Sequence, residues 1–285
     1  MSISPQLGEQ HRVDVPAGAI TYRERGTGTP IVFVHGVAVN GDLWRGVVPK
    51  LADNFRCITP DLPWGSHSIP LKPDADLSLP GMARIVADFL EALDLEGVVI
   101  VADNTGGAVA QALVGRHPER ISRLVLTSCD AFEKFPPTPQ KYLVLMARSR
   151  ILTWIVAYTA KFKLIQRLPT AYGYVTSRPM PTDIMRSYTS PVRLKPGVRR
   201  DFRRMLRAVD TKYTFEAADR LTTFDKPALV LWADNDKIFP RAHGRRLAEL
   251  LPRGEFALVP DSRTFIPEEQ PDLLATAIEN FLLAQ

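Results

Sequence analysis

Cysteine is scarce in this sequence, which holds two in 285 residues, Cys57 and Cys129. Two cysteines cannot form the disulfide framework of a small secreted protein, so we expect a reducing, cytoplasmic compartment. The N-terminal segment lacks the apolar core of a signal peptide. The most apolar stretch, Leu143 to Ala160, is interrupted by Arg148 and Arg150, so it predicts no membrane span.

Several ligand-binding motifs are also missing. The sequence has no Walker A motif, no G-x-G-x-x-G fingerprint and no Cys/His spacing typical of metal sites. We therefore expect neither a metal nor another cofactor. The composition, 45% hydrophobic and 24% charged, excludes disordered and collagen-like chains. The length fits one large domain or two small ones.

Charge is unevenly distributed along the chain. Residues 131–226 contain 19 Lys+Arg and 7 Asp+Glu, whereas the remainder contains 17 and 24. This difference predicts a core formed by residues 1–130 and 227–285 and interrupted by an insertion over 131–226. A basic insertion can attract anionic ligands or membrane surfaces, but a solvated helical surface is the favoured interpretation. The arginine-rich run 199–204 could bind phosphate, yet nothing else in the sequence supports a nucleic-acid partner.

Short apolar runs alternate with helix-like segments outside the insertion. After a hairpin over residues 11–25, the predicted strands are Ile31–Val34, Phe55–Thr59, Val98–Val101, Leu124–Leu126, Ala228–Trp232 and Phe256–Val259. The predicted helices are Leu79–Leu93 with Ser78 as N-cap, Gly106–Gly115, Ala242–Leu251 and Glu268–Leu283. This alternation predicts an α/β fold with a mostly parallel sheet. The insertion shows helical periodicity instead.

Functional residues are expected just after the strands, because ligands bind at the carboxyl ends of strands in open parallel sheets. The junction after Val98–Val101 is the most informative. It places Asn104 at a sharp turn from strand to helix, followed by Gly106 and Gly107, which allow close backbone packing. The N–H group of Thr105 then begins a helix, where it can stabilise an oxyanion.

Four motifs occur in a characteristic order along the chain. They are the turn His35-Gly36, the loop Asp61-Leu62-Pro63 with its following glycine and serine, the Asn104 turn, and Trp232 with Asp236. This order resembles the α/β-hydrolase fold family, closest to the branch of haloalkane dehalogenases and epoxide hydrolases. The resemblance covers nearly the whole chain. It implies a twisted, mostly parallel sheet flanked by helices, with residues 131–226 as a helical lid, or cap.

The sequence departs from the family pattern at two catalytic positions. The resemblance places Asn104 where the family has a nucleophilic Asp, Ser or Cys, and an amide is a very poor nucleophile. It places Thr264 where the family has its general-base His, and a threonine hydroxyl has no useful basicity near neutral pH. Asp103, which precedes the tip, is expected to face away from the pocket.

Other parts of the family site are retained. Asp236 matches the common acid position and Asp130 the alternative one. We expect Asp236 to be structural and to bond backbone amides or Thr264. The backbone N–H groups of Val37 and Thr105 are the predicted oxyanion donors, because side-chain replacement does not remove them.

Further pocket candidates surround these positions. They are His35, Asn40, Trp44, Asp103, Phe132 and Phe265. For His35 the favoured interpretation is a histidine that stabilises the turn, and for Trp44 it is core packing. His67 is expected to be an exposed loop residue. The aromatic residues of the insertion are Phe132, Phe135, Tyr142, Trp154, Tyr158, Phe162, Tyr172 and Tyr174, and we expect most to pack between lid and core and a few to line an apolar pocket.

Three hypotheses follow. The first is an enzyme that acts on a small, largely apolar molecule through an oxyanion-type site, by atypical hydrolysis or by a lyase, isomerase or cyclase reaction. The second is an inactive ligand-binding pseudoenzyme on the same scaffold. The third is a hydrolase in which Asn104 replaces a native carboxylate or becomes one by deamidation. A monomer or a homodimer fits each of them.

Overall fold

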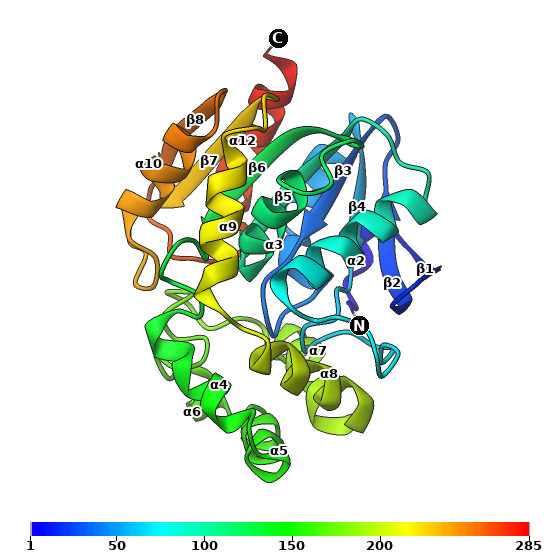
Figure 1. The fold of residues 1–285 in the computed structure, drawn as a ribbon, viewed down its shortest axis with the longest axis vertical. Coiled ribbons are helices and arrows are strands. Elements are labelled where there is room, and N and C mark those ends of the chain that lie inside the picture. Colours follow the sequence, from blue (N-terminus) through cyan, green and yellow to red (C-terminus); the bar gives the residue numbers. More distant parts are fainter. Residues whose placement is uncertain (1, 285) are drawn as a thin grey trace.

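The computed structural model describes residues 2–284 and is built around one eight-stranded sheet (Figure 1). The strands are β1 (Glu9–Val15), β2 (Gly18–Arg25), β3 (Thr29–Val34), β4 (Phe55–Pro60), β5 (Val98–Asn104), β6 (Ile121–Cys129), β7 (Ala228–Ala233) and β8 (Gly254–Val259). Their order is β1-β2-β4-β3-β5-β6-β7-β8. The β1–β2 and β2–β4 pairs are antiparallel, and the other neighbours are parallel.

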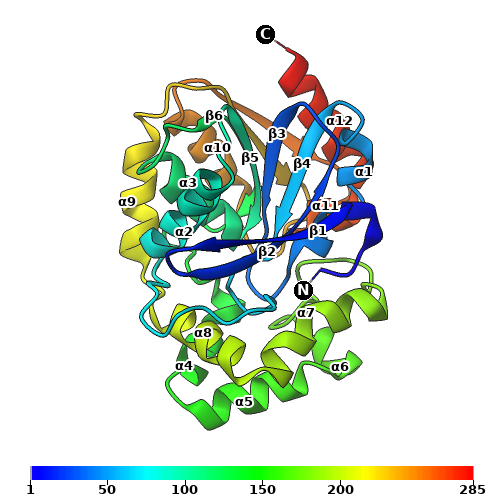
Figure 2. The ribbon, with the colours of Figure 1, turned by 90° about the vertical axis from the view of Figure 1, so that its right-hand side faces the viewer.

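Helices cover both faces of this sheet. They are α1 (Val48–Leu51), α2 (Leu79–Ala92), α3 (Thr105–Val114), α9 (Thr211–Leu221), α10 (Arg241–Leu250), α11 (Ile266–Glu269) and α12 (Pro271–Leu283). Figure 2 shows α2, α3, α9 and α10 on one side of the sheet and α1, α11 and α12 on the other. Because both faces are covered, the central strands carry continuous apolar runs, as a buried parallel sheet requires.

The remaining helices lie beyond one end of the sheet in both views (Figures 1 and 2). They are α4 (Lys141–Met146), α5 (Arg150–Thr159), α6 (Lys163–Gln166), α7 (Thr182–Leu194) and α8 (Pro196–Arg207). The expected helical insertion extends to residue 226, but its last helix, α9, packs against α3. That helix therefore belongs to the layer beside the sheet and not to the group α4–α8.

The α/β fold with a mostly parallel sheet that the sequence predicts is confirmed. Each predicted strand lies within an observed strand, and the hairpin over 11–25 is the β1–β2 pair. Ser78 caps α2, since its hydroxyl oxygen accepts a hydrogen bond from the N–H group of Gly81. The predicted helix Glu268–Leu283 is wrong at its start, because the chain breaks at Gln270 and a new helix begins at Pro271. No helix of residues 2–284 is long and apolar enough to cross a bilayer.

Candidate active site

The strand β5 turns sharply into α3 at Asn104. This residue has φ 57° and ψ −129°, a conformation that costs a non-glycine residue about 1–3 kcal/mol. Close packing holds the turn, since a Cβ on Gly106 would lie 2.3 Å from the carbonyl oxygen of Val34. The small residues predicted to be needed at this turn are therefore required by geometry.

The side chain of Asn104 lies against the turn that follows β3. A Cβ on Gly36 would come within 2.6 Å of Asn104 Oδ1, so only glycine leaves room for the amide there. The hydroxyl of Thr105 is 3.2 Å from Asn104 Oδ1 and 2.7 Å from Asp130 Oδ2. Because this hydroxyl has one proton, it donates to only one of these two oxygens at a time, and Asp130 Oδ2 is the nearer acceptor.

Asp130 is fully buried. Burial raises the pKa of its carboxyl group to about 7, and the hydrogen bond from Thr105 offsets only part of that effect. Its second oxygen, Oδ1, has no hydrogen-bond partner within residues 2–284. Asp130 is therefore a carboxyl group that can gain or lose a proton near neutral pH.

The turn containing Gly36 and Val37 is fixed by His35. The Nδ1 atom of His35 lies 2.8 Å from the carbonyl oxygen of Gly36, and its Nε2 atom accepts a hydrogen bond from the N–H group of Leu62. Burial lowers the pKa of His35 to about 3, so the ring is neutral and Nδ1 donates its proton to Gly36. Both ring nitrogens are thus used by the backbone, in agreement with the turn-stabilising interpretation.

A cavity of about 580 Å³ lies between this turn and the helices α4–α8. Five of the predicted site residues border it: Val37, Asn104, Thr105, Asp130 and Phe265. Most of the remaining wall is apolar, as with Val156 of α5 and Met205 of α8. Tyr172 also borders the cavity. Its hydroxyl donates to the carbonyl oxygen of Ala38 at 2.7 Å, which joins the insertion to the turn after β3.

Asp236 and Thr264 lie close to one another but do not border this cavity. Asp236 Oδ1 accepts hydrogen bonds from the N–H groups of Ile238 and Phe239 and from the hydroxyl of Thr264 at 3.0 Å. These are the contacts predicted for a structural Asp236. Burial raises the pKa of its carboxyl group, although these hydrogen bonds oppose the shift.

Asp103 is fully buried behind the turn, as expected. Its Oδ1 accepts a hydrogen bond of 2.6 Å from the hydroxyl of Thr127 on β6. Burial and the neighbouring Asp236 carboxyl raise the pKa of Asp103 well above its usual value. The residue does not border the cavity, so its prediction as a pocket residue is wrong.

The prediction of pocket residues is also wrong for His35, Asn40, Trp44 and Phe132, none of which borders the cavity. Asn40 caps a short 3₁₀ helix by accepting a hydrogen bond from the N–H group of Asp42. Trp44 packs against Phe33 in the core, which agrees with the packing interpretation. Phe132 is fully buried with Arg246 above its ring.

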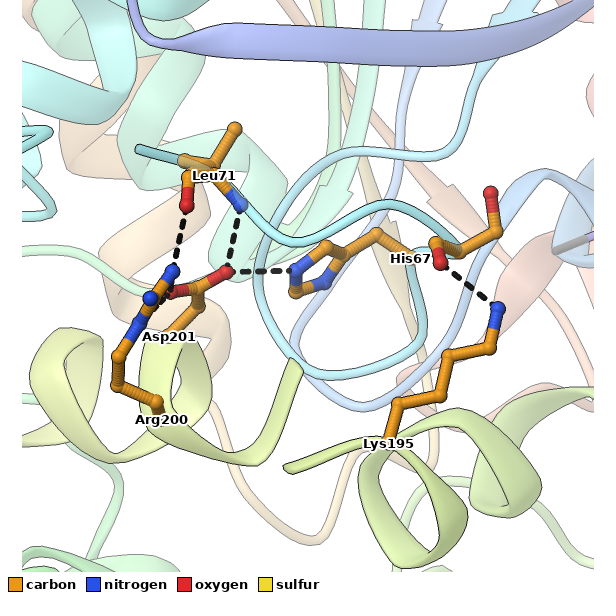
Figure 3. Close-up of polar contacts among 6 residues, drawn as sticks. His67, Leu71, Lys195, Arg200 and Asp201 are labelled. Atoms are coloured by element: carbon orange, nitrogen blue, oxygen red, sulfur yellow. Dashed lines mark hydrogen bonds and ion pairs between the residues drawn. The ribbon is translucent and has the colours of Figure 1, made fainter. Parts of the chain in front are cut away.

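His67 contradicts its sequence interpretation, because it is buried and not exposed. Figure 3 shows its ring directed at Asp201 of α8, with 3.3 Å between Nε2 and Oδ2. Asp201 also accepts hydrogen bonds from the N–H group of Leu71 and the guanidinium of Arg200. Although burial opposes it, these bonds hold the pKa of Asp201 below its usual value. This cluster anchors α8 to the loop between β4 and α2.

Most arginines of the run 199–204 form hydrogen bonds that help to hold α8 in place. Arg200 donates to the carbonyl oxygen of Leu71, and Arg204 donates to that of Ala75. Arg199 donates to the backbone at the end of α7. These contacts give the run a structural use within the fold.

The aromatic residues of the insertion are divided between the cavity and the surface in a way that the sequence did not predict. Phe135, Tyr142 and Tyr172 border the cavity, as expected of a few of them. The side chains of Trp154, Tyr158, Phe162 and Tyr174 are exposed, so the expectation that most pack between lid and core is wrong for these four. Sequence reasoning also missed Tyr188 and Phe202 as cavity residues. The helical periodicity of the insertion was the available signal for Phe202.

The fold and this site together define a class of protein. A mostly parallel sheet, helices on both faces and a strained strand-to-helix turn beneath a pocket are the features of an α/β-hydrolase. The sequence model of the alpha/beta hydrolase fold family matches residues 29–271, and the chain belongs to that family.

Its relatives place the chain close to the haloalkane dehalogenase branch. It is 27% identical to cis-3-alkyl-4-alkyloxetan-2-one decarboxylase of Xanthomonas campestris pv. campestris, over 95% of both chains. It is 26% identical to haloalkane dehalogenase 2 of Mycobacterium tuberculosis, over 96% of both chains. A crystal structure of an alpha/beta hydrolase fold protein from Burkholderia ambifaria is similar at a TM-score of 0.77 and 22% identity, covering 95% of this chain and all of that one.

Proposed function

We propose that this protein is an enzyme that acts on a small, largely apolar organic molecule and forms no covalent bond to residue 104. The observation that carries the proposal is Asp130, a buried carboxyl group with a pKa of about 7 at the wall of an apolar cavity. Such a pKa suits a general acid or base at neutral pH. The hydroxyl of Thr105 lies within hydrogen-bond distance of both this group and the amide at the tip of the turn.

The polar groups at the turn beneath the cavity receive distinct roles in this proposal. Asp130 in its protonated form donates a proton or hydrogen bond to an oxygen of the substrate. The N–H groups of Val37 and Thr105 and the amide of Asn104 stabilise negative charge that develops on that oxygen. Phe265 and the apolar side chains of α4–α8, acting as a lid, exclude water and hold the rest of the molecule.

The usual two-step hydrolysis of the family is disfavoured by the same geometry. Asn104 has no ionisable oxygen with which to attack a carbon atom. Thr264 bonds to Asp236 and supplies no base to activate water. A reaction of the lyase, isomerase or cyclase type needs neither group, and the relatives suggest a first substrate class. One of them is a decarboxylase of dialkyl oxetan-2-ones, so strained lactones are the first compounds to assay.

The test is turnover of a panel of dialkyl oxetan-2-ones, nitrophenyl esters, epoxides and haloalkanes, compared among the wild-type protein, Asn104→Ala and Asp130→Asn. We expect turnover in the wild type, a loss of about 10²–10³-fold in Asn104→Ala and a comparable loss in Asp130→Asn. Asp88→Asn, which alters a buried aspartate outside the cavity, is the matched control and should keep full activity.

Three outcomes would contradict the proposal. A mass increase on the peptide containing Asn104 during turnover would reveal a covalent intermediate. Full activity in Asp130→Asn would remove Asp130 from the reaction. Thermal stabilisation by the compounds without turnover of any of them would favour the ligand-binding pseudoenzyme instead.

A further inference from the structure

The helices α5 and α6 carry an unusual amount of exposed apolar surface on their outer side. Residues 145–168 contain nine of the sixteen large apolar side chains that are exposed among the described residues. Ile151 is 71% exposed and Leu164 is 77% exposed. We call the exposed side chains of residues 145–168 the outer helical face. Contiguous apolar surface of this kind marks an interaction site more often than scattered single residues do.

Aromatic side chains form a continuous row on this face. The rings of Trp154 and Tyr158 are stacked with centroids 5.3 Å apart, and Phe162 meets Tyr158 edge to face. The Lys161 ammonium lies 3.9 Å from the centroid of the Tyr158 ring. Apolar rings combined with lysine at their edge are typical of helices that lie in the headgroup region of a bilayer.

The charge of the surrounding segment has one sign. Between Glu133 and Asp183 the sequence contains eight Lys+Arg and no acidic residue. Arg148, Arg150 and Lys163 are exposed on or beside the outer helical face. A partner protein or a second copy would have to bring acidic groups to this face, whereas an anionic lipid surface presents them everywhere.

A second hollow lies at the end of α6. It has a volume of about 450 Å³, and Lys163, Arg167 and Arg178 border it without any acidic residue. Three cations around a hollow beside an apolar face suit the phosphate of a lipid headgroup. The hollow shares Lys163 and Arg167 with the segment that carries the outer helical face.

The outer helical face lies at one extremity of the molecule. Figures 1 and 2 both place α5 at the end opposite to the C-terminus. The other side of the same helix borders the large cavity through Val156 and Ala157. A surface that contacts α5 therefore lies one helix away from the cavity.

We propose that the outer helical face docks on a bilayer of anionic phospholipids. Its apolar side chains enter the boundary between headgroups and acyl chains, and its lysines and arginines contact the phosphates. The docking is peripheral, since no described helix can span a bilayer. The proposal stands independently of the reaction proposed above, because it uses the outer side of α5 and none of the groups around Asn104.

The test uses the full-length protein and vesicles of phosphatidylcholine, either pure or mixed with an equal part of phosphatidylglycerol. Flotation should recover the protein with the mixed vesicles and not with the pure ones, and added salt should release it. Trp154 supplies a second readout, because Trp44, Trp64 and Trp232 are fully buried whereas Trp154 is 47% exposed. The fluorescence of Trp154 should shift to the blue and resist iodide quenching only when the mixed vesicles are present, and not with the pure ones.

Two pairs of variants separate the charge from the apolar contribution. Each cation removed should weaken binding about fivefold, so Lys163→Glu with Arg167→Glu should weaken it by well over tenfold. Ile151→Ser with Leu164→Ser should abolish the fluorescence shift. Arg253→Glu and Leu283→Ser are the controls. Arg253 is an exposed cation and Leu283 is an apolar side chain of 67% exposure, and both lie outside the outer helical face. Both variants should bind vesicles as the wild type does.

The proposal is overturned by any of three results. The first is a protein that floats with neither kind of vesicle. The second is a loss of binding in the control variants as large as the loss in the variants of the outer helical face. Analytical ultracentrifugation supplies the third, a dimer that Ile151→Ser dissociates, because a second copy then covers the face.

Discussion

Replacing Asp130 by asparagine should make the protein more stable at alkaline pH. The folded chain holds the Asp130 carboxyl at a pKa of about 7, whereas an unperturbed aspartate has a value of 3.8. Because the folded pKa is raised, the folded state binds this proton more tightly than the unfolded state does. The associated stability is therefore fully present below the unfolded pKa and is lost as the pH rises through about 7.

The size of the effect follows from this shift. One pKa unit corresponds to 1.36 kcal/mol, so a shift of roughly three units corresponds to about 4 kcal/mol. An asparagine side chain at this position would have nearly the same shape, would keep an oxygen for the Thr105 hydroxyl and would never ionise. The advantage of Asp130→Asn over the wild type should consequently grow by about 3–4 kcal/mol between pH 4 and pH 8.

The measurement is urea unfolding of both proteins at several pH values across this range. Comparing the two proteins at each pH cancels the titration of all other groups that the substitution leaves unchanged. Asp88→Asn, in which the buried aspartate pairs with Arg84, is the control and should not reproduce the trend. If the difference between wild type and Asp130→Asn changes by less than about 1 kcal/mol over the range, Asp130 does not have the raised pKa on which its proposed role depends.

Three further predictions follow from other contacts. Asn104→Asp should react with a haloalkane to form an ester at residue 104, and this ester should accumulate because Thr264 cannot activate water. Mass spectrometry of the intact protein would detect the ester, whereas multiple turnovers without its accumulation would contradict the prediction. Asp236→Ala should lower the free energy of unfolding by about 1–3 kcal/mol, because it leaves the N–H groups of Ile238 and Phe239 without their hydrogen-bond acceptor. Its turnover per folded molecule should be unchanged, and lost activity at unchanged stability would make Asp236 catalytic. Asp201→Ala should lower the free energy of unfolding, measured with denaturant, by about 3–5 kcal/mol, because it removes the acceptor shared by His67, Leu71 and Arg200. A loss below about 1 kcal/mol would show that the cluster in Figure 3 does not anchor α8.

The fold was predictable because its signals are local. Continuous apolar runs such as Ile31–Val34 identify buried strands wherever they occur, and the small residues after Asn104 identify the turn from strand to helix. The break at Gln270 was missed although Pro271 marks it, because the apolar periodicity continues on both sides of the proline. Periodicity reports which side of a helix is buried and does not report whether the helix is continuous.

The site was predictable only where the backbone defines it. Val37, Asn104, Thr105 and Asp130 lie at or shortly after the carboxyl ends of strands, so their place at the cavity is set by the sheet. The insertion contains no sheet strands that fix the positions of its residues. The sequence alone therefore could not separate the aromatic residues that face the cavity from those that face outward. His67 shows the same limit, since its burial depends on Asp201, which lies 134 residues away in the sequence.

The neighbouring pair Asp103 and Asn104 has a consequence for how reactivity could change in this scaffold. Successive residues of a strand point to opposite sides, so the carboxyl of Asp103 is held against Thr127 while the amide of Asn104 borders the cavity. Exchanging the two residues would move a carboxylate from the interior to the cavity without altering the composition, length or net charge of the chain. The difference between a chain with a nucleophile and one without it is thus a matter of order between two adjacent side chains, a change that bulk properties of the protein would not reveal.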